Sequence, residues 1–297
     1  MNPLVSVILP SYNHARFIEK RLKSILEQSY QNFELIILDD VSLDNSREII
    51  EQYKHHSKVS HVIFNSDNSG STFKQWNKGI ELATGRYIWI AESDDVAELD
   101  FLAQMVQVLK DNDNVAIAFC QSSKMNDQDE ITGSWLEWTK PLKDSHKFNN
   151  SFLMEGNRFI HDYLIYRNVI PNASAVVFRK DIYLKVGGPT VSLRTNGDWE
   201  LWLKMLMIGK VYYCNKLMNN FRYHKGSVIA KASNNHESKF RTKSRLMKND
   251  IDMRNCFEQY LINNFSQATI ISNLNTKQTK KSLFIFNIFS LFSKFFK

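Results

Sequence analysis

The sequence predicts an α/β fold in which a mainly parallel sheet is flanked by helices. In residues 1–120, short and almost wholly apolar runs alternate with segments whose apolar residues recur at helical spacing. Strands that are apolar throughout are typical of parallel sheets covered by helices on both faces. A chain of 297 residues with 43% hydrophobic residues is long enough to bury such a core.

Strand and helix alternate regularly in the first half. The apolar runs predict strands at 5–9, 33–38, 61–64, 87–91 and 115–119. Helical periodicity between them predicts helices at 17–26, 45–54, 73–82 and 99–110. Residues 120–230 are less regular, and we predict helices at 155–167, 181–186 and 198–208 and strands at 173–179 and 210–222. Ligands bind at the carboxyl ends of parallel strands, so the residues after these strands are the first site candidates.

Several classes of protein are disfavoured. The three cysteines (Cys120, Cys214 and Cys256) are far apart and odd in number, which argues against a disulfide framework or a zinc knuckle and favours a reducing compartment. The N-terminus lacks a signal-peptide pattern, and no run reaches the roughly 18 apolar residues of a membrane span. We therefore expect a cytoplasmic protein. The glycine-rich motifs of P-loop NTPases and NAD(P) enzymes are absent.

Carboxylates follow two of the predicted strands. Asp39-Asp40 ends the second strand, and Glu92-Ser93-Asp94-Asp95 ends the fourth. Acidic groups that meet at one sheet edge repel one another unless a cation is present. Carboxylate oxygens suit Mg²⁺ or Mn²⁺, which complete their shells with substrate phosphates, so the pattern indicates a nucleotide-diphosphate site. The alternative is that these Asp residues cap helices and form turns.

The loop after the first strand offers groups for a nucleobase. It reads Pro10-Ser11-Tyr12-Asn13. The Tyr12 ring can stack on a flat base, and Asp40 can accept a hydrogen bond from a base N–H. Alternatively, Tyr12 is a packed loop aromatic.

Residues 5–13, 37–44 and 83–88, followed by Asp94-Asp95, closely resemble glycosyltransferase family 2, whose fold is called GT-A. The resemblance covers about residues 4–230. It implies that Asp94 lies near the donor ribose and that Asp95 binds the metal. The other implied donor-binding residues are Pro10, Tyr12, Asn13, Asp40, Asn68, Gly70 and Asn77. Val41 departs from the family by replacing a common Gly, and Glu92 stands where an Asp is frequent.

The second half must supply a base, because displacement at a sugar carbon requires a carboxylate that deprotonates the acceptor hydroxyl. Asn196-Gly197-Asp198-Trp199-Glu200 resembles the family's catalytic segment, which implies that Asp198 is the base. By position alone Asp198 could equally be a helix N-cap. Glu200 is the reserve candidate, and Trp199 and Trp202 could offer a sugar-stacking surface.

Basic residues follow the last predicted strand. Phe221 to Ser227 resembles a family segment that approaches the diphosphate or the metal, which implies His224 as a metal ligand and Arg222 as a donor-binding residue. A surface histidine is the alternative for His224. His55, His56 and His61 are interpreted as surface residues.

The C-terminal part is strongly basic. Residues 216–297 carry 15 Lys and Arg against four Asp and Glu, which points to an anionic partner or to a merely solvated basic surface. Residues 282–297 are rich in Phe, Leu and Ile between lysines and are too short to span a bilayer. We predict an interfacial membrane anchor; a helix that docks on its own domain or a partner subunit is the alternative.

Together these observations and the resemblance predict an inverting glycosyltransferase that uses Mn²⁺ or Mg²⁺. We expect a UDP-sugar donor and a glycan acceptor, lipid-linked, in surface polysaccharide biosynthesis at the inner face of the membrane; no nucleic acid partner is expected. The predicted domains are a GT-A catalytic domain at 1–230 (nucleotide-binding half 1–120, acceptor-binding half 121–230) and a helical tail at 231–297. The alternatives are a sugar-1-phosphate nucleotidyltransferase and an inactive, membrane-docked binding module.

Overall fold

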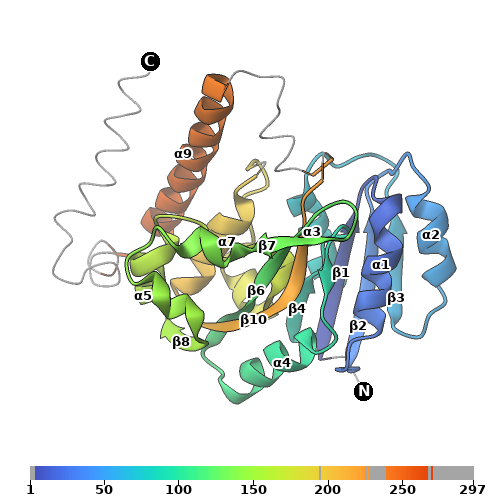
Figure 1. Cartoon of the computed structure of the whole chain (residues 1–297), viewed down its shortest axis with the longest axis horizontal. Helices are drawn as coiled ribbons and strands as arrows, with labels where there is room; N and C mark the ends of the chain where they lie inside the picture. The colour runs from blue at the N-terminus through green and yellow to red at the C-terminus, as the bar shows by residue number, and fades with distance from the viewer. Residues whose placement is uncertain (1–3, 194, 225, 228–238, 267–268, 270–297) are drawn as a thin grey trace.

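The computed structural model describes residues 4–266 and 269, except 194, 225 and 228–238, and arranges them in three layers (Figure 1). A ten-stranded sheet forms the middle layer. The predicted strands are present as β1 (Val5–Ser11), β2 (Phe33–Asp39), β3 (Val59–Phe64), β4 (Tyr87–Ile90), β6 (Val115–Met125), β9 (Val176–Arg179) and β10 (Lys210–Arg222). Three short strands were not predicted: β5 (Val96–Ala97), β7 (Ile131–Ser134) and β8 (Phe152–Glu155).

The predicted helices are also present. They are α1 (Ala15–Leu26), α2 (Ser46–Tyr53), α3 (Thr72–Leu82), α4 (Phe101–Asp111), α6 (Lys180–Lys185) and α7 (Gly197–Leu206). The helix predicted over 155–167 is present but shorter: α5 (Gly156–Phe159) continues directly into a π-helical turn at Ile160–Leu164. A long C-terminal helix, α9 (Lys239–Asn264), closes the described part of the chain.

The sheet is mixed but mostly parallel, in the order β3-β2-β1-β4-β9-β6-β10-β5. Strands β3, β2, β1 and β4 are parallel neighbours. Strand β9 then enters between β4 and β6 and runs antiparallel to both. The predicted α/β class is therefore confirmed, and β9 joins the two halves of the chain in one sheet.

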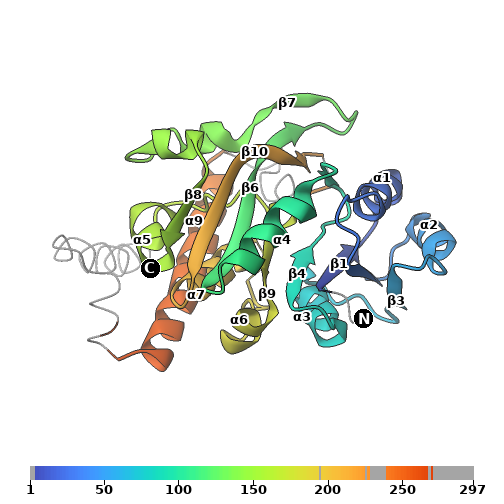
Figure 2. The same cartoon turned by 90° about the horizontal axis from the view of Figure 1, so that it is seen from below.

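Helices bury an apolar core against each face of the sheet (Figure 2). Helices α1, α2 and α4 cover one face, and α3, α6, α7 and α9 cover the other. Helix α3 lies so close to β1 that a Cβ added at Gly79 would come within 2.4 Å of Ile8 Cγ2. Glycine is therefore the residue that permits this contact.

Helix α9 is part of the core. Its residues Met253, Phe257 and Leu261, spaced four apart, are each at most 3% exposed and pack with α7. Burial of such a side chain contributes about 1.5–3 kcal/mol. The predicted domain boundary at 230 falls within 228–238, and the Phe-rich segment 282–297 also lies outside the described residues. In the described part of the chain, no helix has the length and apolar character to span a membrane.

Candidate active site

Parallel pairing brings the candidate loops to one sheet edge. The β1–β2 register sets Ser11 beside Asp39, and the β1–β4 register sets Ile8 beside Ile90. The segments after β1, β2 and β4 therefore start side by side, as the sequence predicted.

The turns after β1 and β2 are tied together. The Asn13 backbone N–H donates to Ser42 Oγ (2.9 Å), and the Asn13 side-chain oxygen accepts from the Leu43 N–H (2.7 Å). Asn13 and Val41 adopt φ values of 56° and 66°. This left-handed conformation favours glycine, the residue common at position 41 in the family, so Val41 adopts it at some cost in strain.

The Tyr12 side chain is 43% exposed beside these turns, whereas Pro10 is buried in β1. Exposure leaves the Tyr12 ring accessible to a base. This favours stacking over the alternative of a packed loop aromatic.

Asp40 organises the loop that contains Asn68 and Gly70. Its carboxylate accepts hydrogen bonds from Asn65 Nδ2 (2.7 Å), Gln75 Nε2 (3.0 Å) and both the backbone N–H and hydroxyl of Ser69. Its backbone oxygen accepts from Asn68 Nδ2 (2.6 Å). A carboxylate has about four acceptor sites, so a base N–H must displace one of these donors before it can bind Asp40.

The Asn77 side chain hydrogen-bonds to a different part of the chain from the loop around Asp40. Its side-chain oxygen accepts a hydrogen bond from the Tyr183 hydroxyl of α6 (2.6 Å). The bond ties α3 to the second half of the chain, and the donor-pocket role of Asn77 stays a prediction.

Two histidines and one carboxylate converge beside β4. His224 Nε2 lies 3.0 Å from Asp94 Oδ2, and one ligand atom each from His14, Asp94 and His224 lie within 4.8 Å of one another. Burial tends to raise the pKa of Asp94, but the hydrogen bond with His224 and the nearby His14 hold it below its ordinary value. His14, which follows Asn13 just after β1, was not predicted from the sequence.

Asp95 and Glu92 complete the acidic cluster. Asp95 Oδ1 accepts from the Arg222 backbone N–H (2.9 Å), while its Oδ2 is buried without a hydrogen-bond partner in the described residues. Burial, and to a smaller extent the negative charge of Asp94, raise the pKa of Asp95. The same two causes raise the pKa of Glu92 to about 8. The buried guanidinium of Arg21 opposes both shifts, and a bound cation would favour the charged form of these carboxyl groups further.

The residues present fit such a cation. Mn²⁺ accepts both imidazole and carboxylate ligands. The group offers the imidazoles of His14 and His224 and the carboxylate of Asp94, and the next residue, Asp95, has a carboxylate oxygen without a hydrogen-bond partner in the described residues. His224 belongs to this group, as predicted. Asp95, the other predicted ligand, is not among its three members, and Asp94 takes that place.

Arg222 does not occupy the predicted place at the donor. It is 1% exposed, and its guanidinium donates to the backbone oxygens of Asp94 (2.7 Å) and Asn126 (2.9 Å) and pairs with Asp129 (2.5 Å). The pattern of basic residues after β10 identified the right segment but could not show that this side chain turns inward. Arg222 therefore holds the acidic cluster in place through its bonds to the Asp94 backbone and the Asp95 carboxylate.

Asp198 lies in the first turn of α7. The N-cap residue of this helix is Asn196, so the N-cap alternative for Asp198 is wrong. Its Oδ2 accepts a hydrogen bond from Asn168 Nδ2 (3.1 Å). Burial raises the pKa of Asp198 to about 6, against the opposing effect of the Trp199 N–H and Asn168. A carboxylate with this pKa is suited to general base catalysis near neutral pH.

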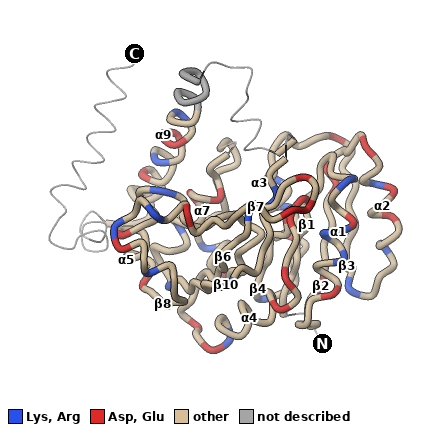
Figure 3. The backbone as a smooth tube through the Cα atoms, viewed as in Figure 1, with Lys and Arg blue, Asp and Glu red and all other residues tan. Residues whose placement is uncertain are grey.

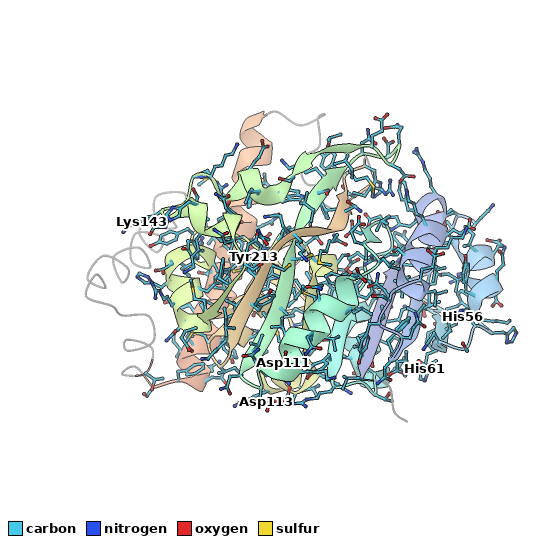
Figure 4. The ribbon with its side chains drawn as sticks, turned by 60° about the horizontal axis from the view of Figure 1, so that its bottom comes forward. His56, His61, Asp111, Asp113, Lys143 and Tyr213 are labelled. Carbon is cyan, nitrogen blue, oxygen red and sulfur yellow. The ribbon has the colours of Figure 1, made fainter. Side chains whose placement is uncertain are left out.

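The neighbouring candidates are structural. Glu200 is fully buried, 2.6 Å from Lys204 Nζ, and also accepts from Thr190. Trp199 and Trp202 are 5% and 0% exposed, so neither offers a sugar-stacking surface. Figure 4 places His56 and His61 at the outer edge of the molecule, in agreement with their interpretation as surface residues.

Residues 6–168 match the sequence family described as Glycosyl transferase family 2. A relative named "Putative teichuronic acid biosynthesis glycosyltransferase TuaG", from Bacillus subtilis, is 30% identical over 227 residues, which are 76% of this chain and 81% of the relative. The matches to two longer glycosyltransferases, from Rickettsia felis and Rickettsia conorii, cover 79% of this chain and 36% of each relative.

Two solved structures share the fold. S. aureus TarS 1-349 in complex with UDP-GlcNAc has a TM-score of 0.66 at 16% identity, over 91% of this chain and 70% of that one. The mannosyltransferase PcManGT from Pyrobaculum calidifontis, in complex with GDP-Man and Mn²⁺, has a TM-score of 0.58 at 15% identity, over 99% and 84%. The family match covers more than half of the residues and agrees with the motifs, the fold and the TuaG similarity: the chain belongs to glycosyltransferase family 2 and is a nucleotide-sugar glycosyltransferase.

Proposed function

We propose that the chain moves a sugar from a UDP-sugar to a glycan acceptor with inversion at the anomeric carbon. The observation that carries the proposal is the pair of sites described above: a cation group beside β4 and, in the second half, Asp198 with its raised pKa. Family membership disfavours both alternatives, the nucleotidyltransferase and the inactive binding module.

The proposed step is a single displacement. The Asp198 carboxylate accepts the proton of the acceptor hydroxyl while the acceptor oxygen forms a bond to the anomeric carbon. The bond from that carbon to the diphosphate breaks, and UDP leaves. The Asn168 amide donates to Asp198 and thereby fixes the carboxylate for this role.

His14, Asp94 and His224, with Asp95 beside them in sequence, would hold Mn²⁺ or Mg²⁺. When bound, the cation would neutralise the charge that develops on the diphosphate leaving group. At the nucleobase end of the donor, Tyr12 and Pro10 would contact the base ring. The loop with Asn68 and Gly70, which is hydrogen-bonded to Asp40, would line the donor pocket.

We further propose a role in surface polysaccharide biosynthesis with a lipid-linked acceptor at the inner membrane face. Support comes from the relative named for teichuronic acid biosynthesis and from the basic, Phe-rich C-terminal sequence. The division into a catalytic domain at 1–230 and a tail at 231–297 is proposed on the same sequence grounds.

A donor panel tests the central proposal. UDP- and GDP-sugars are incubated with the full chain, Mn²⁺ and candidate glycan acceptors, and the released phosphate species is identified. We expect UDP, and a product whose anomeric configuration by NMR is opposite to that of the donor. Release of pyrophosphate, or a product with retained configuration, would contradict the mechanism.

A further inference from the structure

The exposed aromatic surface near Asp198 lies outside helix α7. Trp138 belongs to the short 3-10 helix Trp135–Thr139, which follows β7, and its side chain is 43% exposed. Trp199 and Trp202, which the sequence suggested for sugar stacking, are both core residues. Of these three tryptophans, Trp138 is the one whose side chain is exposed.

Trp138 is held in place although it is exposed. Its indole N–H donates to the backbone oxygen of Asn168 (3.0 Å), and Arg167 Nη1 donates to the backbone oxygen of Trp138 (2.8 Å). The Arg167 guanidinium carbon lies 4.0 Å from the centre of the Trp138 ring, and the Trp135 ring meets Trp138 edge-on at 6.0 Å. A fixed aromatic side chain loses little conformational entropy when it binds a ligand.

Asn168 links this indole to the proposed base. Its backbone oxygen accepts the Trp138 N–H, and its side-chain amide donates to Asp198 Oδ2 (3.1 Å). Trp138 and Asp198 are thus contacts of one residue. The indole is therefore separated from the proposed base by one residue.

We propose that Trp138 is the acceptor platform, against which the apolar face of an acceptor pyranose ring packs. This inference rests on the proposed function, because it takes Asp198 as the base. Arg167 covers one face of the indole, so the sugar ring takes the other face. A tryptophan retained only for stability would bury its ring, whereas this one keeps 43% of its side chain in solvent while its polar N–H is satisfied.

Saturation-transfer NMR tests the platform without knowledge of the natural acceptor. The probes are the methyl β-glycosides of glucose, galactose and N-acetylglucosamine, with UDP and the diamagnetic ion Mg²⁺ present. In the wild-type protein we expect saturation of the ring C–H protons of at least one probe. Trp138→Ala should weaken that binding about tenfold, the loss expected for an aromatic contact of about 1.4 kcal/mol. Trp138→Phe, which retains an aromatic ring, should restore most of it.

Leu153→Ala is the matched control. Leu153 is 47% exposed and pairs with Tyr212 near the start of β10, whereas Arg222 at the acidic cluster ends that strand. Calorimetry of UDP with Mn²⁺ reports whether each variant keeps a folded donor site. Absent probe binding in the wild type, or equal binding in wild type and Trp138→Ala, overturns the platform. If no donor releases UDP but probe binding still depends on Trp138, the transfer proposal fails and the platform stands.

Discussion

Asp198 and Glu200 lie two positions apart in α7 but have opposite surroundings. Asp198 receives one side-chain hydrogen bond, from Asn168, whereas Glu200 is buried in an ion pair with Lys204. We expect Asp198→Asn to lower kcat by about 10²–10⁴-fold, because the amide cannot accept the acceptor proton. UDP affinity and the melting temperature should stay near wild type. Near-normal kcat in Asp198→Asn would refute its role as base.

The pH dependence should follow the same carboxylate. Burial raises the pKa of Asp198 to about 6, and below that pH the protonated carboxyl cannot act as a base. We expect kcat/KM to fall about tenfold per pH unit below this value. The Asn168 amide favours the charged form, so Asn168→Ala should move the inflection to higher pH. An inflection that is unchanged or moves down in the pH–rate profile would contradict this assignment.

A separate prediction concerns the proposed cation site formed by His14, Asp94 and His224. His14→Gln and His224→Gln should each weaken Mn²⁺ binding by at least about tenfold, measured by calorimetry. Asp95→Ala should nearly abolish turnover, and EDTA should do so reversibly. His61→Gln, at the outer edge of the molecule, is the control (Figure 4). Full activity in EDTA, with Mg²⁺ and Mn²⁺ absent, would disprove the metal proposal.

Much of the candidate site could be predicted from the sequence, because the carboxyl ends of parallel strands lie at one edge of the sheet and the residues that follow them meet there. Asp94, Asp95 and His224 were found in this way or by resemblance. Side-chain direction was not predictable: Arg222 and His224 are two residues apart, yet one turns inward to backbone oxygens and the other meets Asp94. His14 and Trp138 carry no periodic signal, so only the folded arrangement reveals them.

At the scale of elements, α9 clamps the loop that precedes Asp198. Asp250 Oδ1 accepts from Asn196 Nδ2 (2.7 Å), and Asn249 Nδ2 donates to Thr195 Oγ1 (3.0 Å). Arg254 Nη1 donates to the Ile165 backbone oxygen (2.7 Å), and its guanidinium carbon lies 5.3 Å from the centre of the Trp199 ring. One helix therefore contacts both the loop before Asp198 and the segment that leads to Asn168.

Asp250→Ala should therefore slow catalysis without removing the donor site. A small displacement of a catalytic group can cost up to about a hundredfold in rate, and we expect kcat to fall by about tenfold or more. UDP binding should be retained. Asp252→Ala, an exposed acidic position two residues further along α9, is the control. Equal kcat values for the two variants would show that the clamp has no role in catalysis.

Periodicity predicted the regular elements better than their pairing. The apolar runs at β1, β2 and β4 predicted parallel strands but not their order in the sheet, and nothing local in Val176–Arg179 shows that β9 enters between β4 and β6. The pairing of β9 depends on contacts distant in sequence. Helix α9 was predicted only as part of a helical tail at 231–297 and not as part of the core, because its polar composition conceals the apolar positions 253, 257 and 261.

At the scale of the whole molecule, charge is unevenly distributed. Residues 216–297 carry 15 Lys and Arg against four Asp and Glu, although the described part of α9 carries both signs (Figure 3). Each basic residue near an anionic bilayer contributes about 1 kcal/mol, and salt screens that attraction. The Phe, Leu and Ile residues of 282–297 would add an apolar contribution that salt does not weaken.

Deletion of residues 282–297 should accordingly release the protein from membranes. In sedimentation with vesicles containing phosphatidylserine, the full chain should pellet and the truncated chain should stay in the supernatant, while both bind UDP and Mn²⁺ equally. Zwitterionic vesicles should bind the full chain more weakly, because the basic excess has no partner there. A truncated chain that pellets like the full one would contradict the anchor. A truncated chain that loses its cooperative melting would instead identify the segment as a docking helix, since a lipid anchor contributes nothing to the folded core.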